Sequence, residues 1–243
     1  MVVTRREALS LAFASMLWTA TSSAREPIVG LPCEGCDAVF VGLPTSIGSP
    51  ARIAPADEPG QPLHLRGRVL DASGNPVAGV IVYAYHTNNA GIYPTDAALK
   101  GTAAARHGRL RGWARSNERG EYEFDTIRPG PYPGRTDPQH IHMHVIEPGR
   151  CTYYIGNVQF TDDPRLTPKE RANAELRRGG PGVATPVRDG SGVWQVTRDI
   201  RLGANIPGYG SCTARAAGRA TQAPLSHDEQ RVKLRAAARY RSA

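Results

Sequence analysis

The sequence lacks the features that would point to a membrane protein, a repeat protein or a nucleic-acid-binding protein. Hydrophobic residues make up only 40% of the 243 residues, and the apolar run at residues 8–20 is too short to cross a bilayer. No internal repeat and no nucleic-acid-binding motif is present, and most of the basic residues behind the net charge of +8 are scattered along the chain. We therefore expect a globular domain that does not bind nucleic acid.

Cysteine is scarce, and its spacing limits what it can form. The four cysteines are Cys33, Cys36, Cys151 and Cys212. The first two have the Cys-x-x-Cys spacing of a redox pair or of half a zinc site, but no second such pair completes a zinc site, and no thioredoxin-like βαβ pattern surrounds them. We expect structural disulfides, and of the three pairings we favour Cys33–Cys36 with Cys151–Cys212.

The N-terminus has the composition of an export signal. Arg5 and Arg6 precede the apolar run, and a small-residue cleavage site, Ser-Ser-Ala, follows at residues 22–24. The paired arginines resemble a twin-arginine signal, and an ordinary secretory peptide is the alternative. We expect residues 1–24 to be removed and the mature protein to be periplasmic, with no membrane span.

The patterning predicts an all-β fold. The chain contains 26 Gly and 20 Pro, which favour short strands joined by turns, and residues 63–69 alternate between apolar and polar with period two. One helix is predicted over residues 168–178, because Pro168 is suited to a first helical position and a Gly-Gly pair follows Arg178. We predict a β-sandwich of mostly antiparallel strands with long loops and one short helix.

The chain divides into four parts by composition. After the signal at residues 1–24, residues 25–62 are rich in Pro and Gly and predict an N-terminal arm. Residues 63–212 hold the predicted strands and form the sandwich domain. Residues 213–243 are rich in Ala, Arg and Gln and have few core residues, so we expect a flexible tail.

The motif His140-Ile-His-Met-His144 is the strongest sign of a metal site. In a strand, residues two apart point to one face, so His140 and His142 form a chelate without the ordering of a loop. The alternative is a polar strand face that meets solvent. We expect His144 to lie beside the metal without binding it. Three other histidines precede this motif, namely His64, His86 and His107. We expect them at the surface, with His107 as a candidate to line the pocket.

Two tyrosines complete a candidate ligand set. Tyr93 ends a turn at residues 88–93, and Tyr132 lies between two prolines. Phenolate oxygen is a hard anionic donor that suits a trivalent metal, whereas zinc more usually binds Cys or carboxylate beside His. The alternative for each tyrosine is packing against the sandwich.

In this order the motifs resemble those of the intradiol ring-cleavage dioxygenases, over about residues 63–202. Residues 85–93 are similar to the segment with the first tyrosine ligand, residues 130–133 to the segment with the second, and residues 140–142 to the paired-histidine strand. The resemblance implies a non-haem Fe(III) ion. Its ligands would be Tyr93, Tyr132, His140 and His142.

The resemblance also implies the reaction, in which a catecholic ring is cleaved with O2 to a muconate-type diacid. Tyr132 would leave the iron when the catechol binds and accept a substrate proton, which makes it the candidate catalytic residue. The partners would be a small catechol and O2, and the sequence leaves a homo-oligomer open. The rivals are a non-catalytic extracytoplasmic β-sandwich that keeps this frame as a binding module, and a zinc hydrolase that uses the same histidines.

The sequence departs from the family pattern near the site. The family usually has an arginine three residues before the first histidine, where this chain has Asp137, and a glutamine where it has Asn157. An aromatic residue that often follows the Pro-Tyr-Pro turn is replaced by Gly134. The candidates for a substitute cation are Arg109, Arg111 and Arg135.

Overall fold

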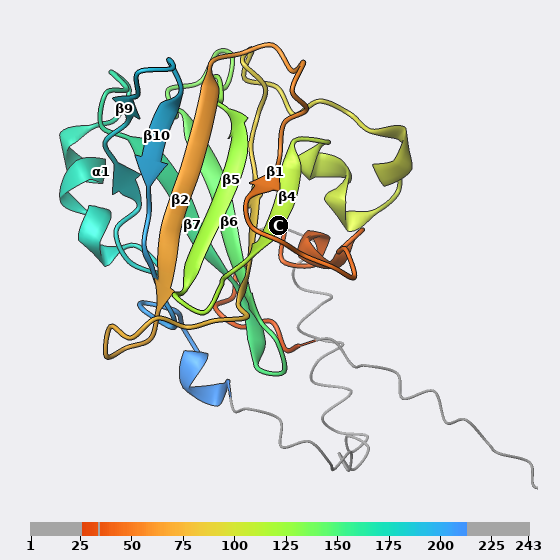
Figure 1. The fold of residues 1–243 in the computed structure, drawn as a ribbon, viewed down its shortest axis with the longest axis vertical. Coiled ribbons are helices and arrows are strands. Elements are labelled where there is room, and N and C mark those ends of the chain that lie inside the picture. Colours follow the sequence, from red (N-terminus) through yellow and green to blue (C-terminus); the bar gives the residue numbers. More distant parts are fainter. Residues whose placement is uncertain (1–25, 34, 213–243) are drawn as a thin grey trace, which may run out of the picture.

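The computed structural model describes residues 26–33 and 35–212 (Figure 1). The predicted signal at residues 1–24 and the predicted tail at residues 213–243 lie outside this part of the chain. In the described part, no helix has the length and apolar character needed to cross a membrane.

Two sheets pack face to face, as the predicted sandwich requires. One runs in the order β1 (Ala51–Arg52), β5 (Glu121–Ile127), β2 (Pro62–Leu70), β10 (Trp194–Thr197) and β9 (Val187–Arg188), with β11 (Ile200–Arg201) also paired to β2. The other runs β4 (Arg111–Arg115), β3 (Ile81–Tyr85), β6 (His140–Glu147), β7 (Cys151–Phe160) and β8 (Val183–Ala184). In Figure 1, β2 and β5 lie in front of β6 and β7.

The sheets contain both antiparallel and parallel pairs, and the short strand β9 pairs antiparallel with β10. The long neighbours pair antiparallel, namely β2 with β5, β3 with β4 and β6, and β6 with β7. The short strands β1, β8, β10 and β11 pair parallel to their longer neighbours. The predicted all-β class is confirmed, and the sheets are mixed because these short strands lie alongside longer ones.

The core between the sheets explains the pattern of β6. Ile141, Met143 and Val145 face inward and pack with residues such as Leu65 and Phe124 of the other sheet. The opposite face of β6 is covered as well, because η1 (Ala38–Phe40) and the segment after it pack on β3 and β6 in a second apolar cluster. Every residue of β6 is therefore buried, including the three histidines.

A bulge in β7 sets which of its side chains face the site. The register moves from Met143 opposite Gly156 to His144 opposite Tyr154, so Ile155 has no partner in the ladder between them. One extra residue reverses the alternation of the strand. As a result Tyr154 and Asn157 share a face, and the Tyr154 hydroxyl donates to the Asn157 Oδ1 at 2.5 Å.

The helix is shorter than the predicted 168–178. The α-helix α1 spans Pro168–Ala172 and starts with a capping box in which Thr167 and Glu170 bond each other's backbone N–H. Asn173 leaves helical geometry, and the 3-10 turn η4 (Ala174–Leu176) follows. The other 3-10 turns are η2 (Ala97–Leu99), η3 (Ala103–His107) and η5 (Tyr209–Ser211).

Both disulfides have the favoured pairing, Cys33–Cys36 and Cys151–Cys212.

The predicted surface position of two histidines, His86 and His107, was wrong. His86 is fully buried and lies against Thr126 of the other sheet, and His107 is 4% exposed and packs on the rings of Tyr83 and Tyr85 of β3. His86 bonds the Thr87 carbonyl through Nδ1 at 2.7 Å and the Thr126 hydroxyl through Nε2 at 2.6 Å.

Burial of His86 predicts a loss of stability in acid. Burial lowers the pKa of His86 from 6.5 to about 4, so the unfolded chain takes up a proton at a pH where the folded chain does not. The stabilisation is complete above pH 6.5 and is lost as pH falls through about 4. We expect the free energy of unfolding, measured by urea titration, to decrease over this range.

The matched variant is His86→Gln, which keeps a hydrogen-bonding group at this position but does not titrate. Its pH dependence should be shallower by up to about 1.4 kcal/mol per pH unit. Equal slopes for the parent and the variant would show that His86 does not carry this proton uptake.

Candidate metal centre

Two loops hold the candidate tyrosines, and Asn88 organises the first. Its Oδ1 accepts from the backbone N–H groups of Ala90 and Ile92, and its own backbone N–H donates to the Ile92 carbonyl at 2.8 Å. The loop therefore closes on itself just before Tyr93. The second loop is fixed to the first because the Gly130 N–H donates to the Asn88 carbonyl at 2.8 Å.

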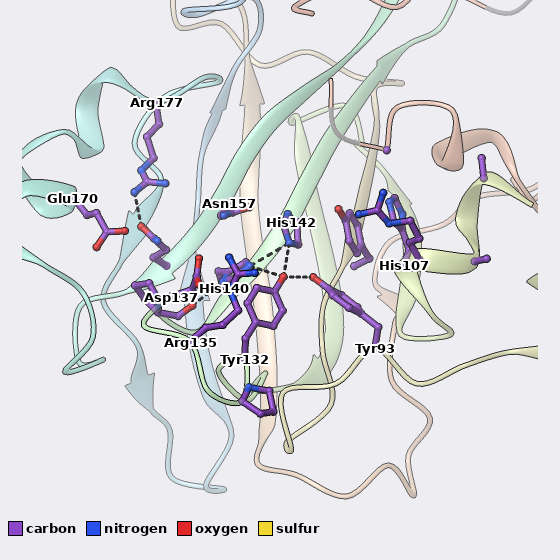
Figure 2. Close-up of a pocket in the computed structure, with 18 residues that line it drawn as sticks. Tyr93, His107, Tyr132, Arg135, Asp137, His140, His142, Asn157, Glu170 and Arg177 are labelled. Atoms are coloured by element: carbon purple, nitrogen blue, oxygen red, sulfur yellow. Dashed lines mark hydrogen bonds and ion pairs between the residues drawn. The ribbon is translucent and has the colours of Figure 1, made fainter. Parts of the chain in front are cut away.

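The two loops approach so closely that glycine is required in each. A Cβ on Gly130 would lie 2.3 Å from the Asn89 carbonyl oxygen, and one on Gly91 would lie 2.0 Å from that of Pro131. Backbone atoms cannot yield as a flexible side chain can. This contact brings the Tyr93 and Tyr132 hydroxyls to 2.5 Å from each other, and Figure 2 shows the two rings pointing toward one another.

The histidines of β6 present their Nε2 atoms to the same point. The His140 Nδ1 lies 2.7 Å from the Pro138 carbonyl oxygen. Because a carbonyl oxygen only accepts, Nδ1 carries the proton and donates it. The Nδ1 of His142 lies 2.9 Å from the Tyr154 hydroxyl, whose own proton is directed to Asn157. When these rings are neutral, Nε2 therefore carries the lone pair, as in a metal ligand whose outer nitrogen is hydrogen-bonded.

Four donor atoms from separate parts of the chain thus converge. The Tyr132 hydroxyl is 3.2 Å from the Nε2 atoms of both His140 and His142, and these nitrogens are 3.1 Å apart. The Tyr93 hydroxyl completes the group (Figure 2). Such separations fit donors that each bind one cation at about 2.0–2.2 Å. The structure brings together all four predicted ligands.

Burial keeps this cluster in a form that can bind a cation. Burial, with a smaller contribution from the charges of His140 and His144, holds the pKa of His142 well below its usual value of 6.5. The ring is therefore neutral near pH 7. It stacks on Tyr85 with ring centroids 4.5 Å apart, because the register pairs these two residues across β3 and β6.

His144 and His107 lie behind the cluster. His144 is fully buried against the Tyr154 ring and is not among the four converging groups. His107 stacks on the other face of Tyr85 at 3.6 Å, and burial lowers its pKa to about 3. No pattern in the sequence placed Tyr85 or Tyr154 beside the histidines, because these contacts follow from strand pairing.

The cluster opens into a pocket of about 970 Å³, within the usual size for small-molecule sites. Tyr93 and His107 lie at one side of it, and Arg177 and Glu170 lie at the other (Figure 2). Asn157 lines the wall between them. The pocket therefore joins the donor cluster to a charged region.

The charges of that region differ from the expected substitutes. Asp137 pairs with Arg135 at 2.8 Å, and this hydrogen bond lowers the pKa of Asp137, so both line the pocket as a neutral pair. Arg109 pairs with Glu58, and Arg111 donates to backbone carbonyls of the arm; neither lines the pocket.

Arg177 was missed by sequence reasoning. It follows η4 and donates through Nη2 to the Gln159 Oε1, while its buried Nε has no hydrogen-bond partner among the described residues. Only the fold shows that this segment reaches the pocket.

Comparison with known proteins decides the family. Residues 40–179 match a family model described as dioxygenase, which covers more than half of the chain. The chain belongs to the intradiol ring-cleavage dioxygenases. The tyrosine and histidine segments in which this sequence resembles that family are those whose side chains converge in Figure 2.

Two curated relatives are similar over part of their length. The chain is 32% identical over 143 residues to chlorocatechol 1,2-dioxygenase from Rhodococcus opacus, covering 51% of this chain and 54% of the relative. It is 33% identical over 124 residues to catechol 1,2-dioxygenase 2 from Acinetobacter lwoffii, covering 44% and 43%. The chain thus spans about half the length of the curated relatives it matches.

A solved structure is also similar. The dioxygenase domain of a dioxygenase–carbohydrate-binding fusion from Streptomyces sp. SirexAA-E aligns with a TM-score of 0.49 at 22% identity. The alignment covers 65% of this chain and 90% of that one.

The glycine contact predicts that Gly130→Ala disrupts the site without changing a ligand. The added methyl group must push the two tyrosine loops apart, and overpacking of this kind costs about 1–3 kcal/mol. We expect a lower melting temperature and reduced binding of a metal that requires both tyrosines. Gly190→Ala is the control, because a Cβ there meets nothing within 4 Å. Full metal binding by Gly130→Ala would contradict the proposed role of the contact.

Proposed function

We propose that this chain is a non-haem Fe(III)-dependent intradiol dioxygenase that uses O2 to open the ring of a catecholic compound, giving a muconate-type diacid. The observation that carries the proposal is the convergence of the Tyr93 and Tyr132 hydroxyls with the Nε2 atoms of His140 and His142. Membership of the intradiol family supports the reaction type. Relatives named as catechol and chlorocatechol dioxygenases support a catechol as substrate.

The donor set suits iron in its ferric state. Two phenolate oxygens are hard and anionic and offset much of the charge of a trivalent ion, while two imidazoles complete the set without further charge. When bound, a ferric ion would supply the Lewis-acid chemistry that holds both catechol oxygens and withdraws electrons from the ring.

We assign the movement of a substrate proton to Tyr132. It lies half-buried on a loop at the pocket wall, and its hydroxyl is within 3.2 Å of both His140 and His142. With a metal bound, Tyr132 would be a phenolate, and a catechol hydroxyl that enters the cluster could pass its proton to the Tyr132 oxygen.

Visible colour tests the ligand set. A ferric ion bound by tyrosinate gives a charge-transfer band, so the iron-loaded protein should be burgundy and consume O2 when a catechol is added. We expect Tyr93→Phe or His142→Ala to abolish the band, because each removes one of the converging donors. Tyr209→Phe is the matched control, since Tyr209 bonds Glu147 away from the pocket.

Other outcomes would favour the rivals. A colourless native protein that contains zinc by elemental analysis would support the metal hydrolase. A protein without metal and without O2 uptake on any catechol tested would support the non-catalytic binding module. Retention of the band in both ligand variants would show that the metal lies elsewhere.

Arg177 is the cation that we assign to the substrate. The carboxylate of Asp137 stands where the family usually has an arginine, and Arg135 is taken up by pairing with it. Arg177 lines the pocket with no acidic partner within ion-pair distance among the described residues, and its Nε is buried without a hydrogen bond there. A cation in this setting can stabilise negative charge that develops on the bound ring.

Arg177→Gln should therefore lower kcat/KM for a catechol by about 10²-fold or more, the usual cost of one oriented donor. The visible band should remain, because Arg177 is not one of the four donors. The control is Arg188→Gln, since Arg188 packs on Trp194 outside the pocket. Unchanged turnover in Arg177→Gln would mean that another group stabilises the charge.

Export to the periplasm is also part of the proposal. The twin-arginine signal predicted at residues 1–24 would carry a folded protein, which suits an ion that is bound before export.

A further inference from the structure

The Cys-x-x-Cys pair lies beside a buried histidine. One sulfur atom from each of Cys33 and Cys36 and one ring nitrogen of His144 all lie within 4.8 Å of one another. Cys33 is half-buried, Cys36 is 4% exposed and His144 is fully buried. The sequence offers only half a zinc site here, and the fold brings the third donor from β6.

The chemistry of this group differs from that of the candidate iron centre. Two thiolates and one imidazole are soft or borderline donors, and a Cys2His set with one open position is a known arrangement for zinc. The neighbouring cluster of Tyr93, Tyr132, His140 and His142 offers hard phenolate oxygens. The two groups therefore select different metals, although both use histidines of β6.

We propose that Cys33 and Cys36, in their reduced form, bind one zinc ion together with His144. A thiol reductant supplies two electrons and two protons to the disulfide and is itself oxidised to a disulfide. A phosphine supplies two electrons, becomes a phosphine oxide and leaves the two protons to come from water. In both cases the S–S bond breaks and two thiols form. Zinc then displaces the two thiol protons, and His144 binds as a neutral imidazole. Water takes the fourth position. The disulfide form that the structure shows has no thiolate to offer.

The surroundings allow an ion to enter and hold it in place. Cys33 lines a surface pocket of about 440 Å³ together with Tyr154 and Arg178, which gives a path from solvent. The rings of Tyr83 and Tyr154 pack against His144 and fix its orientation. Bound zinc would tie the N-terminal segment to β6, which the disulfide alone does not do.

Metal uptake tests the proposal on full-length, iron-loaded protein. The disulfides are reduced with a phosphine, the reductant is removed under anaerobic conditions, and Zn²⁺ or Co²⁺ alone is added. We expect one additional zinc per chain by elemental analysis, absent from the oxidised protein, and thiolate-to-cobalt charge-transfer bands with Co²⁺.

Variants assign the ligands. Cys36→Ser should lose the thiolate bands, and His144→Asn should weaken zinc binding by more than about 100-fold, the upper range for loss of an outer-shell partner. The double variant Cys151→Ser/Cys212→Ser removes the other disulfide and should keep the extra zinc. Tyr93→Phe should also keep it, which separates this site from failure of the proposed iron centre.

A measurement on the unaltered chain guards against variants that do not fold. Zinc should slow alkylation of Cys33 and Cys36 in the reduced protein, as read by peptide mass mapping. The proposal is overturned if the reduced protein takes up no extra zinc, if His144→Asn binds it undiminished, or if zinc leaves the alkylation rate of both cysteines unchanged.

Discussion

Burial of the histidine face of β6 is the constraint on which the rest of the site depends. An ordinary sandwich strand faces the core on one side and water on the other, but this strand is covered on both. Burial makes a charged imidazole costly, which lowers the pKa of His142, and it favours a hydrogen-bond partner for the Nδ1 atoms of His140 and His142. With Nδ1 occupied in His140 and His142, two lone pairs point at one place, and a cation is the natural group to lie between them.

The tyrosines reach that place through backbone contact between two loops. At Gly91 and Gly130 the backbones of the two loops lie in direct contact, with no side chain between them. Loop positions are usually mobile and variable, so a ligand on a loop needs such support. Here it comes from the hydrogen bonds of Asn88 and from two residues without a side chain.

The same strand organises two donor sets of opposite character. Toward the pocket, His140 and His142 meet phenolic oxygens, and toward the N-terminal segment, His144 meets the sulfur atoms of a Cys-x-x-Cys pair. The stack of His142, Tyr85 and His107 continues to Gly35 between those cysteines, because a Cβ there would lie 2.3 Å from the His107 Nε2. Gly35 and His107 therefore line the proposed iron pocket and also lie next to the proposed zinc site.

The sequence by itself determined the all-β class, and it named the four side chains that the fold brings together, Tyr93, Tyr132, His140 and His142. Period-two patterning and paired motifs are local, and the chelate of His140 and His142 needs only an extended strand. Tertiary structure decided what covers that strand, so the burial of His86 and His107 could not be predicted from their neighbours in sequence. It also decided that Asp137 is neutralised by Arg135, that Arg177 reaches the pocket, and that His144 faces the cysteines. Each of these contacts depends on strand register or on the packing of loops that are far apart in the sequence. Composition and motif spacing do not predict which of these segments come into contact.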